Sequence, residues 1–308
     1  MDLIQPMEPV LHDQVFDNQE FTYQLKWDGV RMLAYVNANR VELINKRLNN
    51  RTAQYPELQL LTSLLKGKRA VLDGEVVAFK DSKPSFPTVM SRDNTRSEQQ
   101  VKLLLQEIPV SYIVFDLLRE GDQDLRVLPL TERQQRLQDL VKPEAAIHLI
   151  EDFTSGTSLL AAVQAANLEG IVAKRKNSHY QAGKRHRDWF KIKYRRRQAC
   201  VVGGYSTRNG IVNSLLLGVY QRESLHYVGR AGSGMSEAQW KEADMRLRDL
   251  QISSSPFAGL PSALTREAQF IEPRLVVEVE YAEWTDNMHL RSPVIKGFLK
   301  SAPRKCQM

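Results

Sequence analysis

Short apolar runs alternate with helical patterns over the first two thirds of the chain. The runs rich in Val, Ile, Tyr and Phe are predicted to be strands, because these residues fit a pleated, half-buried surface; they cover residues 21–25, 31–36, 41–45, 70–79, 111–117 and 170–174. Helices are predicted around Pro56, over residues 131–141, where Thr131 and Gln134 form a capping-box pattern, and over the Ala-rich residues 157–167. The pattern indicates a domain of mixed strands and helices.

The pattern changes near Arg197, where shorter strands begin. They are predicted over residues 199–205, 215–220, 225–230 and 275–281. Ser236 and Gln239 form a second capping box, which opens a helix with an apolar face. A small barrel with one helix is compatible with an OB-fold, whose exposed face commonly meets nucleic acid. We therefore expect two domains, residues 1–197 and 198–308.

The positive charge of the chain is concentrated in one segment. Residues 174–197 hold eleven Lys or Arg residues and one acidic residue, Asp188, so they carry +10 and leave −3 for the rest of a chain with a total of +7. A localised basic segment on a nearly neutral body is typical of a protein that binds polyanions. The alternative is a solvated charge run.

Composition excludes several other classes of protein. No apolar run approaches the roughly 18 residues that a membrane span needs, so a soluble protein is expected. Residues 1–6 lack the features of a secretory signal, and only Cys200 and Cys306 could form a disulfide, which together fit a reducing cytoplasm. Cys200 is expected in the core and Cys306 in a loose tail. The six histidines show no metal-ligand spacing.

The sharpest local signal is K-x-D-G-x-R, formed by residues 26–31 directly after a predicted strand. A lysine at a strand end can be held in a pocket where neighbouring cations favour a neutral amine able to attack. Asp28 and Gly29 would make a tight turn, and Arg31 would return toward the same pocket. The alternative is a hairpin turn with a solvated lysine.

Four further clusters follow along the chain. Asp73-Gly74-Glu75 places two carboxylates in an apolar strand, which is costly unless they bind something. Phe115-Asp116 sets an aromatic ring beside a carboxylate, and residues 169–174 begin with Glu169 and end with Lys174. Lys191 and Lys193 alternate on one face of a strand, which suits two oxygens of a phosphate. Each cluster alone has a structural explanation, but a purely structural explanation of all of them in one chain is difficult.

In this order the motifs K-x-D-G-x-R, D-G-E, F-D, E-G-x-V-x-K and K-x-K resemble motifs I, III, IIIa, IV and V of the covalent nucleotidyltransferases, and within them the ATP-dependent DNA ligases. The resemblance covers essentially the whole chain, and residues 178–184 are similar to the ligase module of bacterial end-joining ligases. It implies an α+β fold: a nucleotidyltransferase (adenylation) domain with antiparallel sheets and flanking helices, then a small OB-fold β-barrel domain.

The resemblance also implies roles in the reaction with ATP. Lys26 would attack the α-phosphorus and carry AMP, and Glu169 would hold Mg²⁺ or Mn²⁺. The nucleotide would be held by Phe115 at adenine, by Arg31 and Glu75 at the ribose, by Lys174, Lys191 and Lys193 at phosphate oxygens, and by Arg291 and Lys296 at pyrophosphate.

Other implied roles concern DNA. Asp28 would help in nick sealing, and Arg47 would meet the 5′-phosphate or the nucleotide, although Leu48 follows it where relatives have a small residue or glycine. Independently of the resemblance, the position of Arg195, Arg196 and Arg197 between the two domains favours a phosphate contact, and the alternative is a solvated hinge. Relatives with Glu two residues before the nucleophile differ from this chain, which has Gln24.

The leading hypothesis is a DNA ligase that seals 5′-phosphate and 3′-hydroxyl ends through lysyl-AMP and DNA-adenylate. An RNA ligase, a GTP-using capping enzyme and a non-catalytic nucleic-acid-binding protein are the alternatives. The expected partner is nicked or broken double-stranded DNA, with a Ku-type end-binding protein suggested by the kind of ligase module. A monomer in the cytoplasm of a bacterium, at the nucleoid, without membrane contact, is expected.

Overall fold

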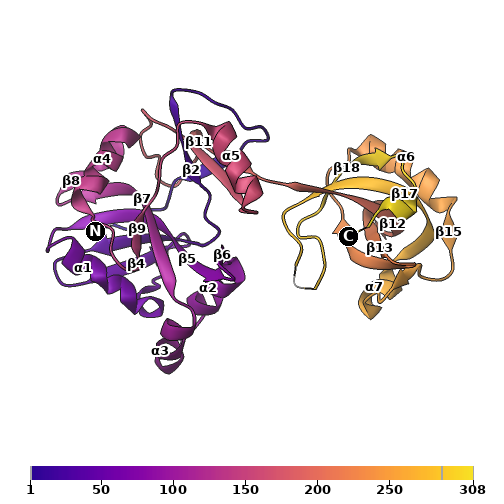
Figure 1. Cartoon of the computed structure of the whole chain (residues 1–308), viewed down its shortest axis with the longest axis horizontal. Coiled ribbons are helices and arrows are strands. Elements are labelled where there is room, and N and C mark those ends of the chain that lie inside the picture. The colour runs from indigo at the N-terminus through magenta and orange to yellow at the C-terminus, as the bar shows by residue number, and fades with distance from the viewer. Residues whose placement is uncertain (1, 286, 308) are drawn as a thin grey trace. The chain divides into compact units, whose positions relative to one another are not determined.

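The computed structural model describes residues 2–285 and 287–307. The chain forms two compact units, Met1–Tyr194 and Arg195–Met308 (Figure 1). The boundary predicted from the sequence, after Arg197, lies slightly further along the chain. Within the described residues, none of the helices is long and apolar enough to cross a membrane.

The smaller sheet of the first unit has four strands in the order β1-β11-β10-β2. They are β1 (Glu8–Leu11), β11 (Arg185–Lys193), β10 (Gly170–Arg175) and β2 (Phe21–Leu25). β10 pairs antiparallel with both of its neighbours, whereas β1 runs parallel to β11 at the edge. Helix α5 (Gly156–Ala165) packs Leu159 and Val163 against one face of this sheet, so only the other face can serve a site.

The larger sheet of the first unit has the order β4-β3-β5-β7-β8. Its strands are β4 (Val41–Asn45), β3 (Val30–Val36), β5 (Ala70–Lys80), β7 (Val110–Glu120) and β8 (Gln123–Asp124), with β6 (Lys83–Pro84) paired to β5 and β9 (Ile147–Leu149) parallel to β7. One face of the larger sheet packs Leu33 and Phe115 against Trp189 of β11 in the smaller sheet. The two sheets therefore face each other.

Helices cover the outer face of the larger sheet. They are α1 (Leu61–Leu64), α2 (Phe86–Asp93), α3 (Glu98–Glu107) and α4 (Leu130–Leu140), with short 3₁₀ turns at Thr52–Gln54, Pro56–Leu60 and Leu125–Val127. Leu61, Val89 and Leu137 bring three of these helices into one core with the sheet. In Figure 1, α1 to α3 lie on the side of β4 and β5, and α5 lies beside β2 and β11.

The predicted strands of this unit are confirmed, and so are the helices predicted over residues 131–141 and 157–167, which form α4 and α5. Other details of the helices differ from expectation. The capping box at Thr131 is wrong, because α4 begins at Leu130 after Pro129, and the Gln134 side chain instead donates to Asp152 at 2.9 Å. Residues 86–107, for which no element was predicted, form α2 and α3, and Ser85 and Ser97 cap them. The predicted helix near Pro56 starts as a 3₁₀ turn.

The second unit is built on a strongly bent antiparallel sheet. Its strands are β12 (Arg196–Arg208), β13 (Ile211–Gln221), β14 (Ser224–Ala231), β17 (Gln269–Tyr281) and β18 (Val294–Leu299), with the short β15 (Gln251–Ile252) and β16 (Phe257–Ala258). Helix α6 (Glu237–Arg248) starts at the predicted capping box, which is confirmed, and packs Ala243 and Leu247 into the core; α7 (Ser262–Glu267) and a 3₁₀ turn at Pro303–Lys305 complete the unit.

The two cysteines lie in this second unit and both are buried. Cys200 belongs to the core, as predicted. Cys306 is only 1% exposed and its carbonyl oxygen accepts a hydrogen bond from the backbone of Tyr220 at 2.7 Å, so the prediction of a loose tail is wrong. Backbone pairing across the barrel holds this end of the chain in place.

Candidate active site

The K-x-D-G-x-R motif links the two sheets of the first unit. β2 ends at Leu25 in the smaller sheet and β3 begins at Val30 in the larger one, so the hairpin alternative is wrong. A Cβ on Gly29 would lie 2.3 Å from the carbonyl oxygen of Val76, which explains why glycine is needed in this link. The link places Lys26 where the two sheets face each other.

Lys26, Glu169 and Lys193 meet at one end of the smaller sheet. Lys26 Nζ lies 2.6 Å from Glu169 Oε2, and Lys193 Nζ lies 2.8 Å from Glu169 Oε1. The Lys26 backbone N–H donates to the Gly170 carbonyl at 3.0 Å, which extends the β2–β10 pairing by one step. Burial opposes ionisation of Glu169, but the two lysines hold its pKa below the ordinary value. Three of the predicted residues thus converge.

Strand register divides the face of the smaller sheet into three rows. We call them the outer rung (Lys26, Gly170, Lys193), the middle rung (Gln24, Val172, Lys191) and the inner rung (Thr22, Lys174, Trp189), because β10 pairs these residues across to β2 and β11. Alternate residues of a strand point to the same face. At about 3.3 Å per residue, the outer and inner rungs are roughly 13 Å apart along the strand.

Arg31 and Asp73 form a double ion pair on the facing sheet. The guanidinium donates to both carboxylate oxygens, at 2.5 and 2.6 Å, and Asp73 is fully buried. The Tyr180 hydroxyl donates to the same carboxylate at 2.6 Å. Burial would lower the pKa of Arg31, but Asp73 raises it above the ordinary value. The guanidinium carbon lies 4.4 Å from the centre of the Phe115 ring, so this pair fixes a cation beside an aromatic surface.

Glu75 and Arg31 are directly paired across β5 and β3. Desolvation raises the pKa of Glu75 to about 7, although the charges of Arg31 and Lys26 oppose this rise. Near neutral pH its carboxyl group can therefore donate or accept a hydrogen bond. That property suits a contact with hydroxyl groups.

Lys174, for which the resemblance implies a phosphate contact, lies beside two aromatic rings. It is 2% exposed, and its Nζ lies 4.1 Å from the ring centres of both Phe115 and Trp189. Within the described residues this Nζ has no hydrogen-bond partner. Burial lowers the pKa of Lys174 to about 7. The inner rung is thus a largely apolar environment built around an amine.

Comparison with known proteins agrees with this geometry. A family model described as "ATP dependent DNA ligase domain" matches residues 3–193, and one described as "ATP dependent DNA ligase C terminal region" matches residues 208–300. The chain belongs to the ATP-dependent DNA ligases. The predicted family, enzyme class and fold, an α+β adenylation domain followed by an OB-like domain, are confirmed.

The relatives of this ligase include proteins of end joining. The chain is 31% identical to the multifunctional non-homologous end joining protein LigD of Pseudomonas aeruginosa, over 93% of this chain and 34% of that protein. It is 32% identical to DNA ligase C of Mycobacterium tuberculosis, over 74% of this chain and 66% of that protein. The chain spans about a third of the length of the LigD proteins it matches.

Solved structures agree as well. The mycobacterial DNA ligase D complexed with ATP and MES shares 28% identity with this ligase, with a TM-score of 0.57 over 98% of this chain and 97% of that chain. A Lig E DNA ligase shares the fold, with a TM-score of 0.63 at 16% identity.

Other predicted residues of this ligase lie around the same site or in the second unit. Lys191 is on the middle rung, where burial and the charges of Lys193 and Lys26 lower its pKa. Asp28 lies in the link between the sheets. Arg47 lies in an exposed turn after β4, where Leu48 has a φ of 61°, the left-handed region that favours the glycine of relatives.

Three of the predicted cations of the second unit pair with carboxylates. Arg197 pairs with Glu278 and Glu280, both at 3.2 Å, Arg291 pairs with Glu283 at 2.6 Å, and Lys296 pairs with Glu280 at 3.4 Å. Within the described residues, Arg195 Nη1 is buried without a hydrogen-bond partner. The DNA contacts of Arg195, Arg196 and Arg197 and the pyrophosphate contacts of Arg291 and Lys296 stay predictions.

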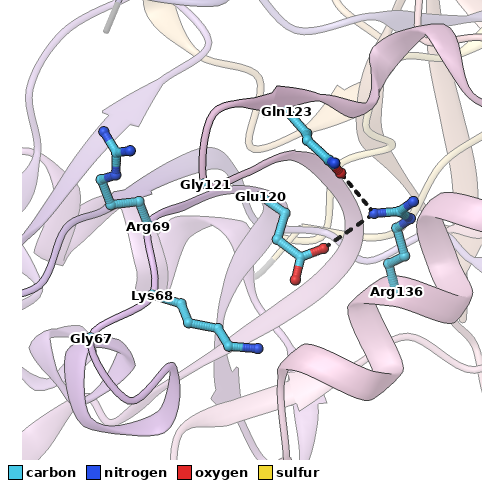
Figure 2. A pocket seen from close by; sticks show the side chains of 7 residues that line it. All are labelled: Gly67, Lys68, Arg69, Glu120, Gly121, Gln123 and Arg136. Atoms are coloured by element: carbon cyan, nitrogen blue, oxygen red, sulfur yellow. Dashed lines mark hydrogen bonds and ion pairs between the residues drawn. The ribbon is translucent and has the colours of Figure 1, made fainter.

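A separate pocket of the first unit has a volume of about 580 Å³ and holds none of the predicted site residues (Figure 2). Arg136 reaches Glu120 at 3.5 Å and Gln123 at 3.1 Å across it. Its other lining residues are Gly67, Lys68, Arg69 and Gly121. Because none of the motif residues lines this pocket, we assign it no part in the reaction.

Sequence reasoning missed three residues that hold the site together. Tyr180 accepts a hydrogen bond from the Met7 backbone N–H at 3.0 Å, and Arg31 reaches the Met7 carbonyl at 3.4 Å. Glu8, next in the chain, pairs with Lys46 at 2.8 Å. Ile4, Met7 and Val10 are spaced three residues apart, which does not match the two-residue period of a strand, so these contacts could not be found from the sequence.

Proposed function

We propose that this chain seals nicks with a 5′-phosphate and a 3′-hydroxyl in duplex DNA, through AMP carried covalently on Lys26. The observation that carries the proposal is the convergence of Lys26 and Lys193 on Glu169. An amine held among other cations suits nucleophilic attack at phosphorus, since the cations stabilise the charge that develops on phosphate oxygens.

In the first step the Nζ atom of Lys26, having lost its proton, attacks the α-phosphorus of ATP. A P–N bond forms, the P–O bond to the β-phosphate breaks, and pyrophosphate leaves with the electron pair. Lys191 and Lys193 stabilise the negative charge that develops on the phosphate oxygens. The ion pair with Glu169 must open before the attack, so Glu169 positions the nucleophile between turnovers.

In the later steps the 5′-phosphate of DNA attacks the phosphorus of lysyl-AMP, and the P–N bond breaks to give DNA-adenylate. The 3′-hydroxyl then attacks the 5′-phosphate, the new phosphodiester forms, and AMP leaves. Asp28, in the link beside Lys26, assists sealing, and Arg47 meets the 5′-phosphate. Both roles follow from the resemblance of their motifs.

The adenosine part of ATP is assigned to the inner end of the site. Phe115 stacks on adenine, and Arg31 and Glu75 contact the ribose hydroxyl groups. Lys174 lies against the Phe115 ring, 4.1 Å from its centre, which supports a place near the base rather than at phosphate oxygens.

Glu169 would hold the divalent metal, Mg²⁺ or Mn²⁺. The described residues contain no group of three or more His, Cys, Asp or Glu side chains able to hold a metal by themselves. A single carboxylate fits an ion of the Mg²⁺ type, which completes its shell with water and substrate phosphates. Bound there, the metal would supply further positive charge at the phosphate oxygens.

Labelled ATP tests the proposal directly. The unchanged protein should retain labelled AMP after denaturation, whereas Lys26→Ala should retain none, and Lys68→Ala, at an exposed lysine of the same unit, should behave as the unchanged protein. Labelled AMP that stays attached to Lys26→Ala would refute the assignment. Chasing the adenylylated protein with nicked DNA or nicked RNA separates the RNA-ligase alternative, and competition by GTP separates the capping alternative.

The wider role is proposed from the names of the relatives. The likeness to non-homologous end joining proteins supports repair of broken as well as nicked DNA, in the bacterial cytoplasm at the nucleoid, by a monomer that works with a Ku-type end-binding protein. Joining of linear duplexes with and without such a protein tests this. Equal joining in both cases would remove the Ku-type protein from the proposal, and no joining of linear duplexes in either case would limit the role to nicks.

A further inference from the structure

Three segments of the first unit meet at the carboxylate of Glu8. Glu8 belongs to β1, Lys46 to the turn after β4, and Arg185 to the start of β11. Lys46 Nζ lies 2.8 Å from Glu8 Oε1, and Arg185 Nη2 lies 3.4 Å from Glu8 Oε2. The two cations remain 53% and 64% exposed. One carboxylate thus holds two solvent-accessible cations that lie far apart in the sequence.

This arrangement has the chemistry of a phosphate site. An ammonium and a guanidinium converge on two oxygens that carry one negative charge, as they would on the oxygens of a phosphodiester. Partial burial opposes ionisation of Glu8, but Lys46 and Arg185 hold its pKa below the ordinary value, so it stays charged near neutral pH. Exposed ion pairs of this kind contribute little to folding, so stability alone does not account for it.

The location connects these residues to the proposed reaction centre. Lys46 directly precedes Arg47, and β11 runs from Arg185 to Lys193 of the outer rung. β1 follows β11 in parallel, with Glu8 opposite Arg185 and Leu11 opposite Lys191. At about 3.3 Å per residue, Arg185 lies roughly 26 Å along β11 from Lys193, so a phosphate bound at this edge would belong to a nucleotide several positions away from the one at Lys26.

We propose that Lys46 and Arg185 bind a backbone phosphate of DNA, and that the Glu8 carboxylate occupies this position in the free protein as an internal competitor. The proposal rests on the proposed function, because it takes duplex DNA as the ligand. When DNA binds, the phosphate replaces the carboxylate between the two cations. Glu8 thereby weakens the binding of these cations to any phosphate that makes no other contact with the protein.

The experiment is a set of charge variants measured by fluorescence anisotropy with a nicked duplex over a salt titration. Glu8→Gln frees both cations and should tighten binding roughly fivefold at low salt, with a steeper dependence on salt. Lys46→Gln should weaken binding and reduce the slope of log K against log salt by about 0.9, the value for one phosphate contact.

The decisive readout is the coupling between Glu8 and its two cations, Lys46 and Arg185. The Glu8→Gln/Lys46→Gln/Arg185→Gln triple variant should bind no more tightly than the Lys46→Gln/Arg185→Gln double variant, because no cation is left to be freed. The matched control is Glu98→Gln, which removes the same charge from an exposed ion pair with Lys102 on α3. Equal gains from Glu8→Gln and Glu98→Gln, or a gain that persists in the triple variant, would overturn the proposal.

A parallel measurement separates this site from the nucleotide phosphates. Self-adenylylation should keep the same KM for ATP in all the variants of this experiment. It also shows that each variant is folded. A changed KM with unchanged DNA affinity would assign Lys46 and Arg185 to ATP and overturn the proposal. If the unchanged protein formed no lysyl-AMP, the proposed function would fail, but the DNA-binding cycle would still test Glu8.

Discussion

Lys26 and Lys174 lie on the same face of one sheet in opposite environments. Lys26, on the outer rung, is 23% exposed and ion-paired with Glu169 at 2.6 Å. Lys174, on the inner rung, is 2% exposed and lies between the Phe115 and Trp189 rings. One short sheet face is therefore charged at one end and desolvated at the other. This arrangement matches a ligand with phosphates at one end and a flat base at the other.

Removing the charge that organises the outer rung should have the largest effect. Glu169→Gln keeps the size of the side chain but leaves Lys26 and Lys193 without their shared carboxylate. We expect lysyl-AMP formation to slow at least about 100-fold, because the nucleophile is no longer positioned. A quenched time course with labelled ATP measures this, and Glu98→Gln is the control. A normal rate in Glu169→Gln would mean that the reaction does not occur at the outer rung.

Breaking the buried pair beside Phe115 should come next. Asp73→Asn leaves the Arg31 guanidinium without its carboxylate, and we expect a loss of about 3 kcal/mol in the free energy of unfolding in urea. The KM for ATP should rise as well, since Arg31 is no longer fixed over the ring.

The matched control for Asp73→Asn is Glu57→Gln. Glu57 pairs with the buried Arg92 at 2.8 Å, outside the site. This variant should lose stability but keep the KM for ATP. If both variants changed KM equally, the effect of Asp73 would be general loosening of the fold rather than a property of the inner end.

The desolvated amine of the inner rung should make stability depend on pH. The pKa of Lys174 is lowered to about 7, below the roughly 10.4 of an ordinary lysine. Its protonation therefore opposes folding fully below about pH 7, and this cost disappears as the pH rises toward the ordinary value.

Lys174→Met should accordingly raise the free energy of unfolding, most at pH 6 to 7 and least near pH 10, with a change of at most about 1.4 kcal/mol per pH unit. Urea unfolding at several pH values measures this, with Lys68→Met as the exposed control. A constant difference across this range would show that Lys174 is charged and solvated in the folded protein.

The sequence predicts the residues of the outer rung, whereas the inner end of the site depends on contacts between distant segments. Lys26, Glu169 and Lys193 were found because each stands at a fixed place in a motif next to a strong strand pattern. For Asp73 the sequence indicates only that a carboxylate in an apolar strand needs a partner. The structure gives that compensation as Arg31 and Tyr180, which lie 42 and 107 residues away. Only the folded chain brings these partners together.

The smallest effect is expected for Tyr180→Phe, which distinguishes the contribution of Tyr180 to Asp73 from that of Arg31. Tyr180→Phe removes a neutral donor to Asp73 and the acceptor of the Met7 backbone N–H, but it keeps the Arg31–Asp73 ion pair. We expect a loss of about 1 to 2 kcal/mol in urea unfolding and less than a twofold change in the KM for ATP. Burial and Asp73 raise the pKa of Tyr180, so its hydroxyl stays protonated and the loss should be the same from pH 6 to 9. A loss of stability as large as that of Asp73→Asn would mean that Arg31 is held mainly by the segment that carries Met7 and not by the ion pair. The inner end of the site would then depend on this N-terminal segment rather than on charge.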